Sequence, residues 1–496
     1  MRAGLVLLLI SFLAACSAPL PLAGEPSSPS QVFESARPAV VIVGAFYSVT
    51  WSAPLPTLTA DAARRLQQRA VAEARSWGAP TSLGQAELQL LAQDPGAWLS
   101  AGPERRRQTD VVEAQGSGFF VTQDGDLLTN DHVVEMSRQE MERLLVAGLE
   151  QQGSDPLAMR ALQQEVSSAL GVTVSDAQAR QLLQWAVRRA SSDLQIVSVA
   201  ASYRIGFGSQ TMRQVESSGV PVRLIRHGAP APGRDVALLR APGGPYPTLA
   251  LASSAPPQGA ALDVIGYPCR CTQQPEADRT LSATLSQGHL VGVLPMPGGW
   301  EALGTDAQIQ AGNSGGPVLD DRGRVVGLAT FTDAAGQGAR RAFAVPVDVA
   351  RQLLRAAGVD PSQGPIGREY ARAVAEFDRQ HYRAALPLFQ HLVAVEDHHD
   401  PYAPAYLERS RQAIAAGADR TPPPWAGVAF VLLLGLVAGA AGVTVLLLLR
   451  RRRRPHWVEG EIVAEQPAEV PPDRSAALER PVLPGETVVD AEAWWE

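Results

Sequence analysis

A series of short segments rich in β-branched and aromatic residues constrains the fold of this chain more than any other feature. They read "ARPAVVIVGAFYSVTW" (36–51), "GSGFFVTQDGDLLTNDHVV" (116–134), "DLQIVSVAASYRI" (193–205), "VPVRLIRHG" (220–228) and "RDVALLRA" (234–241). Such residues favour strands, and Asp124-Gly125 between two apolar runs is a strong signal for a tight hairpin turn. We therefore predict a mainly β core of antiparallel hairpins.

Two longer segments differ from this pattern. Residues 58–107 contain "ADAARRLQQRAVAEARSW", and residues 137–192 contain "SRQEMERLLVAGLEQQ" and "SDAQARQLLQWAVRRA". Their apolar residues recur at helical spacing. Because a long surface connection adds little loop entropy, a β core can carry such segments. We predict helical insertions at about 58–107 and 137–192, which are candidate surfaces for a protein partner.

Charge and length exclude some classes of function. The 496 residues carry a formal net charge of −7, which gives no basic surface for nucleic acid. The chain is long enough for more than one domain, and its 46% hydrophobic content is ordinary for globular protein.

The N-terminus resembles an export signal. The apolar run that ends in "LAAC" is too short to span a bilayer but suits the core of a secretory signal, which we place at 1–16. The final Cys16 resembles the lipidated cysteine of a bacterial lipobox, whereas an ordinary cleavage site near Ala15 or Ala18 is the alternative. Both interpretations predict a bacterial protein exported from the cytoplasm.

Near the C-terminus, residues 425–449 contain no charged side chain, and five arginines follow at 450–454. About 20 apolar residues suffice for a helix that crosses a bilayer, and cationic flanks stay in the cytoplasm. We therefore predict a single-pass membrane protein with a transmembrane helix at 425–449. Its acidic, proline-rich tail, residues 450–496, would be cytoplasmic and disordered.

Three residues form a candidate catalytic set. Ser314 lies in the glycine-rich string "QAGNSGGPVL", His132 ends an apolar strand in "LLTNDHVV", and Asp235 opens another in "RDVALLRA". A serine hydroxyl becomes an effective nucleophile when a base accepts its proton. A buried carboxylate can fix the tautomer of that base.

The order His132, Asp235, Ser314 and the strings around these residues resemble the trypsin-like serine proteases of the HtrA/DegP type. "GSGFFV", "LLTNDHVV", "DVALLRA", "TDAQIQAGNSGGPVLDDRGRVVGLATF" and "AFAVPVDVARQLL" occur in the order found in that branch. The resemblance implies a protease domain at 33–355 with two antiparallel six-stranded β-barrels of the chymotrypsin type. It also implies a serine endopeptidase that acts on protein or peptide substrates, in protein quality control or a stress response.

The same resemblance implies an oxyanion hole and a specificity pocket. The turn of Gly312, Asn313 and Ser314 would supply the oxyanion hole through backbone N–H groups. Gln308, Ile309, Leu328 and Thr330 would shape a shallow pocket for small aliphatic residues.

The chain departs from that branch after residue 355. The glycine-rich carboxylate loop of a PDZ domain is missing there, and residues 366–417 read as a helical hairpin. Its "YRAALPLF" resembles one tetratricopeptide-like repeat, although Pro387 is awkward inside a helix. This segment is either a small partner-binding unit or a structural stalk.

No cofactor or metal site is predicted. His381, His391, His398 and His399 lack the spacing of a ligand pair and read as a solvated polar face. Cys269 and Cys271 are either free or reversibly paired thiols or a structural bridge, and two sulfurs alone cannot close a zinc site. The competing class of function is a catalytically silent scaffold that binds a partner through its helical regions. The sequence does not predict the oligomeric state.

Overall fold

The computed structural model describes residues 28–76, 82–152, 156–269, 278–297, 299–333, 341–395, 400–423 and 425–452. The predicted signal sequence with Cys16, the tail from residue 453, Cys271, His398 and His399 lie outside these residues. The described chain divides into two compact units, Met1–Pro422 and Pro423–Glu496.

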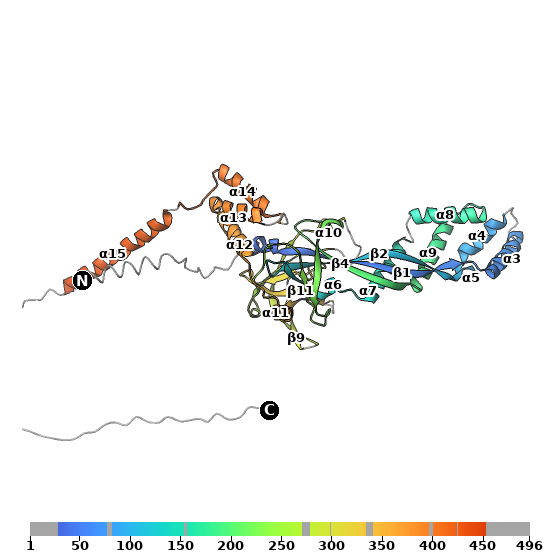
Figure 1. Cartoon of the computed structure of the whole chain (residues 1–496), viewed down its shortest axis with the longest axis horizontal. Coiled ribbons are helices and arrows are strands. Elements are labelled where there is room, and N and C mark those ends of the chain that lie inside the picture. The colour runs from blue at the N-terminus through green and yellow to red at the C-terminus, as the bar shows by residue number, and fades with distance from the viewer. Residues whose placement is uncertain are drawn as a thin grey trace, which may run out of the picture. The chain divides into compact units, whose positions relative to one another are not determined.

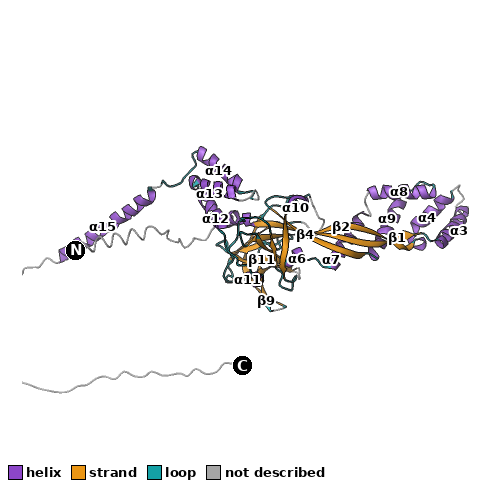
Figure 2. Cartoon of the chain, in the orientation of Figure 1, coloured by secondary structure: helices purple, strands orange, loops and turns teal. Residues whose placement is uncertain are grey.

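The first unit contains two closed antiparallel β-barrels of six strands each, as predicted (Figures 1 and 2). The first barrel has the strand order β1-β2-β3-β6-β5-β4. Its strands are β1 Val40–Thr57, β2 Ser100–Phe120, β3 Asp126–Thr129, β4 Gln195–Gly206, β5 Val220–His227 and β6 Ala237–Arg240. The predicted hairpin turn at Asp124-Gly125 connects β2 to β3, and Gly125 has the positive φ of +97° that such a turn favours.

The second barrel has the strand order β10-β11-β12-β9-β8-β7. Its strands are β7 Ala261–Gly266, β8 Thr284–Met296, β9 Trp300–Thr305, β10 Pro317–Leu319, β11 Val325–Asp333 and β12 Arg341–Pro346. One large apolar cluster joins residues of both barrels, among them Phe119, Leu238, Tyr267 and Leu328. The two barrels therefore share one apolar core where they meet.

The two predicted helical insertions are present, and they pack on each other. Helices α3 Ala60–Ser76, α4 Leu83–Gln93 and α5 Pro95–Trp98 connect β1 to β2. Helices α7 Arg138–Gln152, α8 Pro156–Leu170 and α9 Asp176–Ser192 precede β4. Leu88 of α4 and Leu182 of α9 belong to one apolar cluster, so two segments far apart in sequence form a single helical subdomain.

The predicted boundary of the first insertion is wrong at its end. Residues 100–107 belong to β2, because they pair with the end of β1 in a register that matches Ser52 with Arg107 and Thr57 with Ser100. The charged string there resembled the helix before it. Pairing with a distant strand decided its conformation, which local composition does not encode.

The segment predicted as a helical hairpin has three helices. They are α12 Pro365–Asp378, α13 Tyr382–Val395 and α14 Ala403–Ala415, and α13 continues through Pro387. The third helix belongs to the same core, since the ring of Tyr406 stacks on Phe389 with centroids 4.9 Å apart. The hairpin prediction is therefore corrected to a three-helix unit.

This unit packs on the N-terminal helix α2, Pro29–Ala36, and on the 3-10 helix Arg37–Ala39 that follows it. The Arg37 guanidinium lies 4.2 Å from the ring centroid of Tyr402, and the Tyr406 hydroxyl donates to the Glu34 carboxylate. The other helices among the described residues of the first unit are α6 Asp131–Val134, α10 Met212–Ser218 and α11 Val347–Ala356.

The second unit contains helix α15, Ala426–Arg452. A search of the described residues finds no helix with the length and apolarity needed to cross a membrane. The side chains of residues 426–431, 433–434 and 449, within the stretch predicted as a transmembrane helix at 425–449, lie outside those that the structure describes.

Candidate active site

Two neighbouring strands bring His132 and Asp235 together. His132 lies in α6, directly after β3, and Asp235 lies just before β6. These strands pair antiparallel, with Thr129 opposite Ala237, so the end of one lies beside the start of the other. The imidazole Nδ1 is 2.8 Å from Asp235 Oδ2, and the backbone N–H of His132 donates to Oδ1 over 3.0 Å.

Asp235 is completely buried, and several donors hold it. Besides His132, the Thr330 hydroxyl donates to Oδ2, and the Asn130 side-chain amide donates to the Asp235 backbone carbonyl over 2.7 Å. Burial alone would raise the pKa of this carboxyl, but its bonds with His132 and Thr330 outweigh that effect and lower the pKa below its ordinary value. The carboxylate is therefore ionised at neutral pH.

Ser314 lies in the loop between β9 and β10 and is half-buried. Its Oγ donates to the Thr330 backbone carbonyl over 3.1 Å. Within the described residues no hydrogen bond joins this hydroxyl to His132. Thr330 thus contacts both Ser314 and Asp235, and the three predicted residues converge around one position of β11.

The turn before Ser314 has the backbone that an oxyanion hole needs. Gly312 has a φ of +88° and Gly315 a φ of +84°, a region that side chains rarely adopt. A Cβ atom at Gly312 would lie 2.3 Å from the Tyr267 carbonyl oxygen, and one at Gly315 would lie 2.2 Å from that of Ser117. Only glycine fits at either position.

Two backbone donors of this turn are available. The N–H groups of Gly312 and Ser314 have no hydrogen-bond partner within the described part of the chain. The N–H of Asn313 donates to the Gln310 carbonyl over 3.1 Å. Among the three predicted oxyanion residues, the Asn313 N–H therefore already has a partner within the turn, and the oxyanion hole itself stays a prediction.

The four predicted pocket residues do not gather at one surface. Gln308 is exposed, Ile309 is buried in the second-barrel core, and Leu328 is fully buried in the shared core. The Thr330 hydroxyl donates its hydrogen bond to the Asp235 carboxylate. Residues 334–340, which follow β11, lie outside the described residues, so the pocket stays a prediction.

A second aspartate–histidine pair lies beside the first, and the sequence analysis missed it. His227 at the end of β5 places Nδ1 2.9 Å from Oδ1 of the buried Asp131. Asp131 Oδ2 is buried without a hydrogen-bond partner among the described residues. Burial raises the pKa of Asp131, which His227 offsets only in part. The available signal was Asp131 itself, directly before the predicted catalytic histidine.

The remaining cysteine and histidine candidates contact other protein groups where they are described. Cys269 is disulfide-bonded, which excludes a free thiol at this position and leaves a reversible pair and a structural bridge as the alternatives. The imidazole of His381 is 2.8 Å from Glu376, and that of His391 is 2.9 Å from Glu369.

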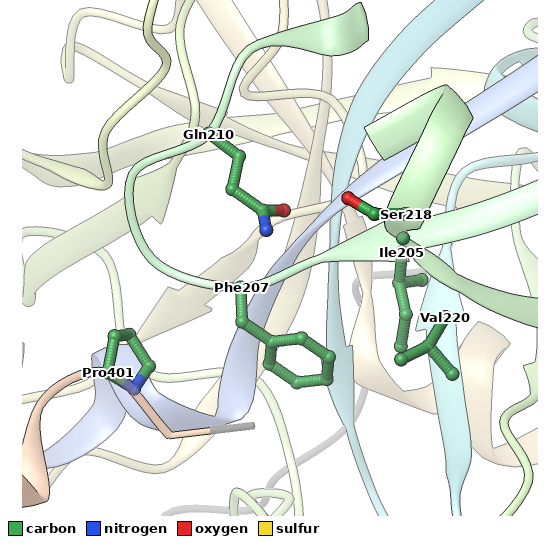
Figure 3. A pocket seen from close by; sticks show the side chains of 7 residues that line it. Ile205, Phe207, Gln210, Ser218, Val220 and Pro401 are labelled. Carbon is green, nitrogen blue, oxygen red and sulfur yellow. The ribbon is translucent and has the colours of Figure 1, made fainter. Parts of the chain in front are cut away.

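A small pocket of about 220 Å³ lies away from this site. It lies between the first barrel and Pro401, just before α14, and Figure 3 shows the Gln210 side chain extending across it toward Ser218. None of the candidate catalytic residues lines it.

Comparison with known proteins identifies the class of the domain that contains these residues. Residues 116–328 match the family described as "Trypsin-like peptidase domain", so the chain contains such a domain. Two curated proteins show weak, partial similarity of the HtrA/Deg type. Protease Do-like 5, chloroplastic, from Arabidopsis thaliana is 43% identical over 74 residues, which cover 13% of this chain and 23% of that protein. The putative serine protease HhoA from Synechocystis is 46% identical over 66 residues, 12% of this chain and 16% of that protein. The chain therefore matches less than a quarter of the length of either relative.

Proposed function

We propose that the protein is a serine endopeptidase that cleaves protein substrates through an acyl-enzyme. The observation that carries this proposal is the contact of the buried Asp235 with His132 Nδ1 at 2.8 Å, in a peptidase domain. The glycine turn of that domain also has two N–H groups without a hydrogen-bond partner among the described residues. A protein that only binds a partner through its helical regions needs neither feature.

The reaction would begin when Ser314 Oγ attacks the peptide carbonyl carbon. In the structure this hydroxyl donates to Thr330, so attack requires its proton to turn toward His132 Nε2. That nitrogen takes the proton as the Oγ–C bond forms, and Asp235 stabilises the imidazolium. The oxyanion would accept hydrogen bonds from the N–H groups of Gly312 and Ser314. Removal of one such donor in comparable enzymes costs about 3 kcal/mol of transition-state stabilisation.

His132 would then return the proton to the leaving amine as the C–N bond breaks. Water would then hydrolyse the ester: it gives a proton to His132 as its oxygen bonds to the acyl carbon, and His132 returns that proton to Ser314 Oγ as the bond between Oγ and the acyl carbon breaks. Each proton that leaves a nucleophile returns to a leaving group, so the enzyme is regenerated unchanged.

The first test is casein hydrolysis by the full chain and by Ser314→Ala. We expect the substitution to lower kcat by about 10⁶-fold, as removal of a triad member does elsewhere. Ser410→Ala is the control, because it deletes a buried hydroxyl in α14 that donates to the Tyr406 carbonyl and lies outside the candidate active site. If the wild type neither cleaves casein nor reacts with a fluorophosphonate at Ser314, the scaffold function replaces this proposal.

Location outside the cytoplasm and attachment to the bacterial cell membrane are proposed from the sequence of the two termini alone. Fractionation of the producing cells checks both. We expect the protein in the membrane fraction, with the protease domain sensitive to added protease in intact spheroplasts. Recovery of the whole chain in the soluble cytoplasmic fraction would contradict it.

A further inference from the structure

Ser117 of β2 connects the first barrel to the oxyanion turn of the second. The side chain is completely buried. Its hydroxyl donates to the Gly312 carbonyl over 2.7 Å and accepts the backbone N–H of Tyr267 over 2.9 Å. A serine hydroxyl has one proton. Because the Tyr267 N–H occupies a lone pair, the proton is left for Gly312.

The backbone of Ser117 holds the same turn at a second point. Its N–H donates to the Ser314 carbonyl over 2.7 Å, and its own carbonyl accepts the Thr129 hydroxyl over 2.7 Å. One residue therefore bonds the carbonyls on both sides of Asn313. Thr129 in turn fixes Ser117 against β3, the strand that leads to His132.

These bonds matter because they add to the few backbone bonds that hold the turn, among them the one from the Asn313 N–H to the Gln310 carbonyl. Gly312 lacks a side chain, and glycine adopts several backbone conformations at similar energy. In a planar trans peptide the carbonyl oxygen and the following N–H point in opposite directions. Fixing the Gly312 carbonyl therefore fixes the peptide between Gly312 and Asn313, and fixing the Ser314 carbonyl fixes the peptide that follows Ser314. The Ser314 N–H lies between these two peptides and the Gly312 N–H directly precedes the first, so rotation of either peptide would break a bond to Ser117 and move a donor.

We propose that Ser117 is a positioning residue that holds the Gly312 and Ser314 N–H groups in the geometry that stabilises the oxyanion. The inference rests on the proposed peptidase function. The first barrel, which carries His132 and Asp235, would then also position the Ser314 loop of the second barrel through direct hydrogen bonds.

The experiment compares full-chain wild type, Ser117→Ala and Ser410→Ala on a peptide substrate that the wild type cleaves. We expect Ser117→Ala to lower kcat by about 10- to 100-fold, less than the loss of a whole oxyanion donor, with KM within about twofold of wild type because ground-state binding is unchanged. Affinity for a peptide aldehyde, whose adduct with Ser314 forms the oxyanion, should fall by the same factor as kcat. Ser410→Ala should change none of these values.

Ser117→Thr keeps the hydroxyl and separates positioning from folding. Circular dichroism at the assay temperature first confirms that each variant is folded. Recovery of kcat in Ser117→Thr to within about fivefold of wild type, beside the loss in Ser117→Ala, supports the positioning role. An unchanged kcat in folded Ser117→Ala overturns it, as does equal loss in both variants. If the wild type itself is inactive and unlabelled by a fluorophosphonate, the peptidase function fails, and the inference fails with it.

Discussion

Two aspartate–histidine pairs in the first barrel share a geometry but differ in electrostatics. The Nδ1 to carboxylate distances are 2.8 Å for His132 with Asp235 and 2.9 Å for His227 with Asp131. Both aspartates are buried, and both imidazoles are partly exposed. Yet the pKa of Asp235 lies below its ordinary value and that of Asp131 lies above it.

The number of donors explains the difference. Asp235 accepts bonds from the His132 backbone, the His132 ring and the Thr330 hydroxyl, whereas Asp131 Oδ2 has no partner among the described residues. Burial penalises the charge in both cases, and only the first carboxylate is compensated by enough hydrogen bonds. A short contact with histidine therefore does not by itself make a catalytic pair.

The sharpest test of this contrast compares Asp235→Asn with Asp131→Asn. The first should lower kcat by about 10⁴-fold, since an asparagine leaves the imidazole in the wrong tautomer. The second should change kcat by less than about threefold, because His132 does not bond to that side chain and effects within this range are ordinary for residues outside the site. Peptide hydrolysis at pH 8 measures both. Similar losses of kcat in the two variants would contradict the proposed difference between the two aspartate–histidine pairs.

A smaller effect is expected from Thr330→Val. This substitution leaves Asp235 with fewer hydrogen-bond donors, as Asp131 already has. The substitution removes one donor from a buried carboxylate and should lower the free energy of unfolding by about 1–3 kcal/mol at pH 7. Because the folded pKa of Asp235 is depressed, its stabilising contribution is present above the ordinary value near 3.9 and disappears as the pH falls through the folded pKa. Urea unfolding at pH 7 and pH 3 should show a larger difference at pH 7. A difference independent of pH would assign the loss to packing.

The smallest effect should be a gain in stability from Asp131→Asn. Burial raises the pKa of Asp131, so ionisation above that pKa costs folding energy that an amide avoids. We expect an increase of up to about 1 kcal/mol at pH 8, which disappears about one pH unit below the ordinary value near 3.9, where the carboxyl is protonated in both states. Thermal unfolding at the two pH values checks this. Destabilisation at pH 8 would mean that the bond to His227 outweighs the burial penalty.

Local pattern predicted much of this protein because its signals act over short distances. The alternating apolar segments, the Asp124-Gly125 turn and the helical spacing of 137–192 each reflect neighbours in sequence, and the structure contains the corresponding elements. The catalytic candidates also stood in informative strings. Their meeting could be inferred only by resemblance, since His132 and Asp235 are 103 positions apart.

Features that depend on contacts between segments far apart in the sequence could not be predicted. Residues 100–107 became a strand because β1 lay opposite them, and α14 joined α12 and α13 through the ring contacts of Tyr406. Thr330 was predicted as a pocket residue by resemblance, and the sequence did not indicate that its hydroxyl donates to Asp235. The sequence did not indicate a role for Ser117, because the groups that its hydroxyl contacts, Gly312 and Tyr267, belong to the other barrel.

The sequence by itself determined the strand-rich core, the places of its helical insertions and the chemical types at positions 132, 235 and 314, because periodicity and turn chemistry are local properties. Only the tertiary structure decided which carboxylate is held ionised, which N–H groups remain free and which residue ties the two barrels at the oxyanion turn. Those outcomes depend on burial and on hydrogen bonds between segments that meet only when both barrels have closed.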